Sequence, residues 1–215
     1  MWTDLWDELY HQHSGENACA ALPELAEIAS SGTPADRLQA VELAGALIAS
    51  AVPYTAEIRD RYASEISAML REVRSELVED CMGDDHEPDA FVYRLQSMLA
   101  FEETTVWSQK LDGLVTGEFE IECPMCFATM FLVIGKHSFF TCWDDYALGD
   151  VDKIPLVAAV PDQLTDLGDR LYRLAVAGRQ HTVARQLTFL FGRATCPENA
   201  HEFTPADAVT AAATY

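Results

Sequence analysis

The sequence predicts a mainly α-helical protein with a small antiparallel β insertion in its second half. Apolar residues recur at steps of three and four over residues 1–105 and again after residue 160, which is the spacing of one face of an α-helix. Between about residues 117 and 143 the period changes to two, as in a half-buried strand. We therefore expect stacked antiparallel helices, interrupted by a three-stranded antiparallel β meander.

Five helices are expected in the first half of the chain. The first carries Trp2 and Trp6, and the second ends at Ser31 and Gly32. The third has Thr33 as N-cap and Pro at the first helical position, where the missing N–H costs nothing, and runs to about residue 51. The fourth is the longest, from Thr55 to about Asp80, with one apolar and one charged face. A fifth follows the polar break at residues 81–88.

The β insertion begins with residues 117–123, where glutamates alternate with Phe119, Ile121 and a cysteine. An apolar run over residues 127–134 and an aromatic-rich segment at 137–143 supply two more strands, joined by a two-residue turn at Gly135 and Lys136. Helices resume near residue 161, again from about 182 to 191, and after Thr204. The chain is thus expected to have a helical region at 1–105, a β meander at 106–155 and a helical region at 156–215 that packs with the first two.

The charge balance limits the classes of partner. The chain has 35 acidic and 14 basic residues, a net charge of −21. Such a surface repels nucleic-acid backbones and anionic lipid, and it attracts basic proteins. The N-terminus has no basic leader, and the longest apolar stretch, residues 43–52, is about half of what a membrane span needs. We expect a soluble cytoplasmic protein with a basic protein partner, no direct nucleic acid and no membrane, and a homodimer remains open.

The C-x-x-C of Cys123 and Cys126 predicts half of a metal site. Zinc requires deprotonated thiolates in a tetrahedron, and two intervening residues let one turn direct both sulfurs at one ion. The best second half is Cys196 with His201, which would complete a structural zinc site of three cysteines and one histidine. Cys142 is the rival fourth ligand. It ranks lower because a two-residue turn at 135–136 would place it opposite residue 129, roughly 10 Å along the strand from Cys126.

Other readings of these residues stay open. The cysteines could be core thiols without metal, or a redox dithiol, although a redox motif normally opens a helix in a βαβ unit and here a strand follows. His11 and His13 could bind a metal, but side chains two residues apart diverge on a helix. The acidic loop with Asp144, Asp145, Asp150 and Asp152 could hold a hard cation, but it lacks a full ligand loop.

Two segments carry a family resemblance. Trp2-x-x-Leu-Trp6-x-x-Leu-x-His11-Gln12, followed by the Ala-Leu-Pro helix at residues 18–28, resembles uncharacterised bacterial proteins related to HEAT repeats. This resemblance covers about the first sixty residues and implies an α-solenoid with a surface for another macromolecule and no activity. The rear half resembles a separated pair of zinc knuckles. Such knuckles commonly read C-P-x-C, and here Asn199 stands at the last position, which leaves His201 to complete the ligand set.

Two function classes remain. The first is a non-catalytic interaction or scaffold protein with a structural zinc and a basic partner, such as a toxin that it neutralises or a nucleic-acid-binding protein for which it mimics DNA. The second is a metal-dependent hydrolase with an open zinc position for water. Closed cysteine-rich sites are structural, whereas catalytic zinc favours histidine and carboxylate ligands. The cysteine-rich set therefore favours the first class over an enzyme.

Overall fold

The structure is a computed structural model that describes residues 2–12, 17–52, 54–79, 87–103, 105–143, 146 and 151–213. The chain forms two compact units. The first unit comprises Met1–Asp80 and Tyr93–Leu111, and the second comprises Cys81–Val92 and Asp112–Tyr215. The first unit takes most of the helical region expected at 1–105. The second takes most of the β meander and all of the C-terminal helical region.

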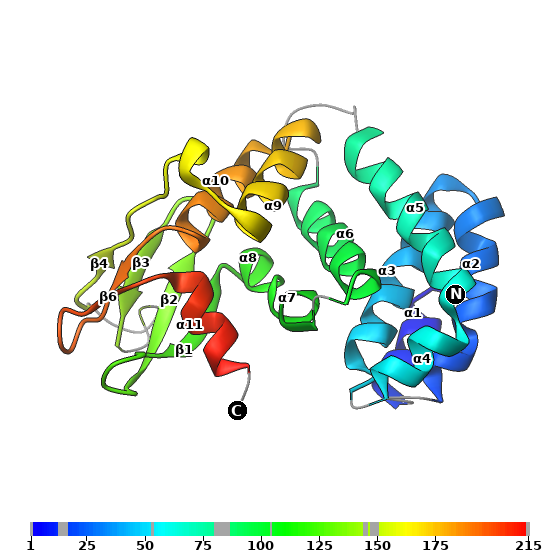
Figure 1. Cartoon of the computed structure of the whole chain (residues 1–215), viewed down its shortest axis with the longest axis horizontal. Helices are drawn as coiled ribbons and strands as arrows, with labels where there is room; N and C mark the ends of the chain where they lie inside the picture. The colour runs from blue at the N-terminus through cyan, green and yellow to red at the C-terminus, as the bar shows by residue number, and fades with distance from the viewer. Residues whose placement is uncertain are drawn as a thin grey trace. The chain divides into compact units, whose positions relative to one another are not determined.

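The first unit is helical, as predicted (Figure 1). Its α-helices are α1 (Trp2–Trp6), α2 (Leu22–Ser31), α3 (Pro34–Ser50), α4 (Thr55–Arg61), α5 (Ala63–Glu79), most of α6 (Pro88–Phe101) and α7 (Thr105–Lys110). The 3-10 turn Ala18–Ala21 precedes α2, and α1 continues as a π-helix over Asp7–Gln12. HEAT-like stacking of these helices stays a prediction.

The predicted start of α3 is confirmed. Thr33 is the N-cap, its hydroxyl oxygen accepts a hydrogen bond from the backbone N–H of Asp36, and proline occupies the first turn. The Asp36 carboxylate also accepts hydrogen bonds from the Thr33 hydroxyl and from the Trp2 indole, at 2.7 and 2.8 Å. These two contacts lower the pKa of Asp36. The hydrogen bond from Trp2 to Asp36 therefore joins α1 to the beginning of α3.

Helix α3 is the centre of the first unit, because it packs against α2, α4, α5 and α7. More than one of its faces is buried, and its small residues let neighbours approach closely. A Cβ on Gly45 would lie 2.6 Å from the Cα of Ser97 in α6, so glycine is required where these two backbones meet.

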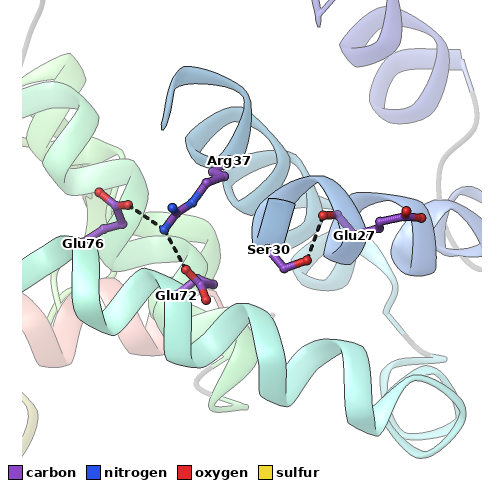
Figure 2. A network of polar contacts seen from close by, with 5 residues as sticks. All are labelled: Glu27, Ser30, Arg37, Glu72 and Glu76. Carbon is purple, nitrogen blue, oxygen red and sulfur yellow. Dashed lines mark hydrogen bonds and ion pairs between the residues drawn. The ribbon is translucent and has the colours of Figure 1, made fainter. Parts of the chain in front are cut away.

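Ion pairs also connect helices α3 and α5 (Figure 2). Arg37 of α3 reaches Glu72 and Glu76, one turn apart on α5, at 2.9 and 3.4 Å. On α2, the Ser30 hydroxyl donates to the backbone carbonyl of Glu27 at 2.9 Å. The arginine and both glutamates are partly exposed, so each ion pair contributes less than about 1 kcal/mol. These contacts orient the helices, and burial of their apolar faces stabilises them.

The long helix predicted at residues 55–80 is interrupted at Tyr62. The backbone N–H of Tyr62 still donates to Ile58, and its carbonyl accepts from Ile66, so the hydrogen bonding continues across the break between α4 and α5. Regular apolar spacing predicts which face of a helix is buried. It does not reveal a single residue that departs from helical geometry, so the break was not predicted. The buried face is the expected one, since Ile58, Met69 and Val73 have no exposed surface, although Tyr62 at the break is only half-buried.

The second unit is built on an antiparallel sheet with strand order β1-β2-β3-β4. The strands are β1 (Glu118–Glu122), β2 (Thr129–Ile134), β3 (Phe139–Cys142) and β4 (Ile154–Pro155). The alternation predicted for β1 is confirmed, because its glutamates are exposed and Phe119 and Ile121 are buried. The prediction of three strands was wrong. The added strand has only two residues, too few to show a periodic pattern, and it forms by pairing with β3.

The turn between β2 and β3 is also longer than predicted. Ile134 pairs with Phe139, so four residues rather than two form the turn, and the N–H of Gly135 donates to the Ser138 carbonyl. The register therefore moves by two residues. Cys142 lies opposite Phe131 instead of Thr129, still farther along the sheet from the C-x-x-C.

Helices and a second hairpin complete the second unit. They are α8 (Gly113–Thr116), α9 (Asp166–Ala177), α10 (His181–Leu190), the two-stranded sheet of β5 (Ala194–Thr195) and β6 (Glu202–Phe203), and α11 (Pro205–Ala212). Helix α11 lies beside β1 (Figure 1). The helices expected at 182–191 and after Thr204 are thus present, although the Thr204 side chain makes no capping hydrogen bond. The helix expected near residue 161 begins later, because Pro161–Gln163 is a 3-10 turn and α9 starts at Asp166.

Gln186 ties three elements of this unit together. Its side chain is 2% exposed and donates to the carbonyls of Leu114 in α8 and Ile134 in β2, at 2.8 and 2.9 Å. Gln186→Leu keeps the volume and removes both donors, so we expect a loss of about 1–3 kcal/mol in the free energy of unfolding. Urea denaturation measures it. The same change at the exposed Gln163 is the control and should cost almost nothing. Equal stabilities of the two variants would contradict this role.

None of the helices in the described part of the chain has both the length and the apolar character needed to cross a bilayer. Several residues considered from the sequence lie outside the described residues, namely His13, Asp144, Asp145 and Asp150. The side chain of His11 is likewise not described.

Candidate metal centre

The first knuckle, residues 123–128, is the six-residue turn that joins β1 to β2. The backbone N–H of Cys123 donates to the Ala128 carbonyl, and the N–H of Phe127 donates back to the Cys123 carbonyl, both at 2.9 Å. Phe127 has a left-handed backbone with φ of 60°. A bulky residue rarely adopts this conformation, and the two hydrogen bonds hold it there. The turn directs the Cys123 sulfur inward, and the N–H of Met125 approaches it at 3.4 Å.

The second knuckle, residues 196–201, joins β5 to β6 and repeats this backbone arrangement. The N–H of Cys196 donates to the His201 carbonyl at 2.9 Å, and the N–H of Ala200 donates to the Cys196 carbonyl at 3.0 Å. Ala200 has a φ of 57°, like its counterpart in the first knuckle. Each knuckle therefore begins with a cysteine followed by proline and ends with the same pair of backbone hydrogen bonds.

The two knuckles bring three sulfur atoms together. The Sγ atoms of Cys123, Cys126 and Cys196 all lie within 4.8 Å of one another. The sulfurs of Cys126 and Cys196 are 3.8 Å apart, and both thiols are free. In a tetrahedral site with metal–sulfur bonds of about 2.3 Å, neighbouring sulfurs are about 3.8 Å apart. The three thiols are thus spaced to hold one metal ion.

The surroundings of the sulfurs favour a thiolate at one of them. Burial raises the pKa of the Cys123 thiol. Hydrogen bonds from the backbone N–H groups of Cys126 and Met125, together with the neighbouring thiols, outweigh this effect and lower the pKa to about 7. Burial raises the pKa of Cys196, and the other two thiols add to this increase. Metal binding requires deprotonated sulfur, and the lowered pKa of Cys123 favours that form.

The second hairpin is held against the main sheet by a buried contact. Thr141 of β3 is fully buried, and its hydroxyl donates to the backbone carbonyl of Thr195, at 2.7 Å, next to Cys196. Strand β5 also packs on β3 and β4. This contact places the second knuckle against the first, although the two lie about seventy residues apart in the sequence.

The structure brings together three of the four predicted ligands. His201 is outside the group of three sulfurs, and it contributes its main chain to the knuckle. Its carbonyl accepts from Cys196, and its N–H donates to the side-chain oxygen of Asn199 at 2.9 Å. The rival ligand Cys142 is also outside the group, fully buried beside Val133 and Phe140.

Two contributions to this site were not predicted. The first is the hydroxyl of Thr141, which looks like an ordinary strand residue in the sequence. The second is Asn199, whose side-chain nitrogen lies 3.8 Å from the Cys123 sulfur. A signal for Asn199 was present, because it stands where a second C-P-x-C would place its last cysteine.

Comparisons with protein-family models, with curated proteins and with solved structures found no match for this chain. The resemblance to HEAT-related proteins therefore has no support beyond the residues that suggested it.

Proposed function

We propose that this protein is a non-catalytic interaction protein, in which a structural zinc ion joins the two knuckles and an acidic surface binds a basic protein. The single observation that carries the proposal is the group of three sulfurs shared by two hairpins distant in sequence. An ion at this point would hold β1, β2, β5 and β6 in one arrangement. Such an ion would be structural, because the free energy of metal binding would add to the stability of the folded protein.

The donor set favours a structural over a hydrolytic metal. Catalytic zinc sites favour histidine and carboxylate ligands. Among the described residues, no histidine, aspartate or glutamate joins the three cysteines. Three thiolates more than cancel the charge of a dication, so a water bound there would be poorly activated. These points favour a scaffold over a metal-dependent hydrolase with an open zinc position.

The surface beside the first knuckle suits a basic partner. Glu118, Glu120 and Glu122 are exposed on one face of β1. Met125 and Phe127, at the tip of the knuckle, are 60% and 71% exposed. Exposed apolar side chains within an acidic surface supply contact area, and the charge steers the partner. A basic toxin or a nucleic-acid-binding protein, bound in a cytoplasmic setting, fits this chemistry.

The test is capture of the partner followed by association kinetics over a range of salt concentrations. We expect a basic partner whose association rate falls about tenfold or more from low to high salt, because screening removes the steering. Glu120→Gln with Glu122→Gln should slow association. Glu57→Gln with Asp60→Asn removes the same charge from α4 and should slow it less. Acidic partners or salt-independent rates would reject the proposal.

A further inference from the structure

Asn199 occupies the position in the second knuckle that Cys126 occupies in the first. Both knuckles are six-residue turns with the same pair of backbone hydrogen bonds and a left-handed fifth residue. In both knuckles, the sulfur of the first cysteine accepts hydrogen bonds from the backbone N–H groups two and three residues later. The donors are Met125 and Cys126 in the first knuckle, and Glu198 and Asn199 in the second. The fourth corner of a site made by this pair therefore falls at Asn199.

The Asn199 side chain does not offer a metal ligand in this arrangement. Its oxygen accepts the hydrogen bond from the backbone N–H of His201 at 2.9 Å, which fixes which end of the amide is oxygen. Its nitrogen is therefore the atom that lies 3.8 Å from the Cys123 sulfur and donates to it. An amide NH₂ group is a hydrogen-bond donor and does not bind a cation.

His201 does not reach this corner either. It is the counterpart of Ala128, two residues beyond the corner, and two backbone hydrogen bonds hold its main chain in the turn. Its ring nitrogens are not among the atoms that cluster within 4.8 Å.

The corner at Asn199 faces solvent. Asn199 is exposed and Cys126 is half-buried, whereas Cys123 and Cys196 have no exposed surface. A dication with three thiolates carries a net charge of −1, and Glu122, Glu198 and Glu202 are exposed on the two hairpins. This charge opposes a free anion, such as a carboxylate, that approaches from solution, whereas it does not oppose an uncharged nitrogen donor.

We propose that the metal ion bound by Cys123, Cys126 and Cys196 keeps an exchangeable fourth position beside Asn199, which takes an external imidazole group. The inference rests on the metal site of the proposed function. In the exchange, the bond from the ion to water breaks and a bond to the imidazole nitrogen forms, and no electron is transferred. The imidazole belongs to a small molecule or to a histidine of another protein.

Cobalt(II) in the full-length protein reports its ligands through visible absorption, and it tests the position directly. We expect imidazole to shift the cobalt bands of the wild type in a saturable titration, with acetate much weaker. Asn199→Cys should add a fourth thiolate, raise the sulfur-to-cobalt absorption by about one third and tighten cobalt binding about tenfold or more. It should also abolish the response to imidazole. His201→Ala should change neither the spectrum nor the affinity.

Free imidazole is compared with an acetylated, amidated tripeptide that has histidine at its centre. Binding of both indicates a position open to a protein histidine, and binding of imidazole alone indicates a small-molecule ligand. Loss of cobalt affinity in His201→Ala, or a wild-type spectrum indifferent to imidazole, would overturn the inference while leaving the metal site intact. Failure of the wild type to bind cobalt at all would instead reject the metal site of the proposed function.

Discussion

Cys123→Ser is expected to abolish stoichiometric metal binding and to loosen the second unit, while the helices of the first unit remain folded. Structural zinc in small folds contributes an apparent ~10–16 kcal/mol, part of which is offset here by the ordering of the long segment between the ligands. Even about 3 kcal/mol of net loss would lower the melting temperature of this unit by about 10 °C. The loss should begin at the two knuckles, because the three thiols lie there.

Metal analysis of protein purified without added metal and segment-resolved hydrogen exchange measure this effect. Exchange should accelerate over residues 118–134 and 194–203 and stay unchanged over α3. Cys142→Ser is the matched control, because Cys142 is equally buried in the same sheet but lies outside the group of three sulfurs. It should retain the metal. A Cys123→Ser variant with unchanged metal content and melting temperature would leave these cysteines as ordinary core residues.

Gly192→Ala is expected to destabilise the second unit by about 3 kcal/mol or more, at the upper end of the cost of overpacking. A Cβ at this position would lie 2.2 Å from the Val157 carbonyl, 2.8 Å from that of Thr188 and 2.9 Å from the N of Ala159. All three are backbone atoms, so no side chain can rotate away. A backbone hydrogen bond also connects two of these residues, since the N–H of Ala159 donates to the Thr188 carbonyl at 2.8 Å.

Gly135→Ala is the matched control in the same unit. A Cβ there would meet only the Ser138 carbonyl, at 3.7 Å, which is an ordinary contact. Urea denaturation of both variants should show a large loss for Gly192→Ala and almost none for Gly135→Ala. A Gly192→Ala protein as stable as the wild type would mean that the segments around Val157 and Thr188 can separate without cost.

Much of the fold could be predicted because its signals are local. The N-cap of α3 at Thr33 and the alternation of β1 each depend on a few consecutive residues. The break at Tyr62, the four-residue turn before Phe139 and the two-residue strand β4 could not. Each of these depends on how a segment pairs or packs with another, which apolar spacing does not encode.

The sequence by itself determined the helical character, the place of the β insertion, the acidity and the two knuckles as candidate metal-binding turns. The tertiary structure alone decided that three sulfurs converge, since the buried Thr141 hydroxyl and the pairing of β5 with β6 set the second knuckle against the first. It also placed the side-chain nitrogen of Asn199 3.8 Å from the Cys123 sulfur. The reason is physical: a turn defines where its own side chains point, whereas the distance between two turns depends on everything packed between them.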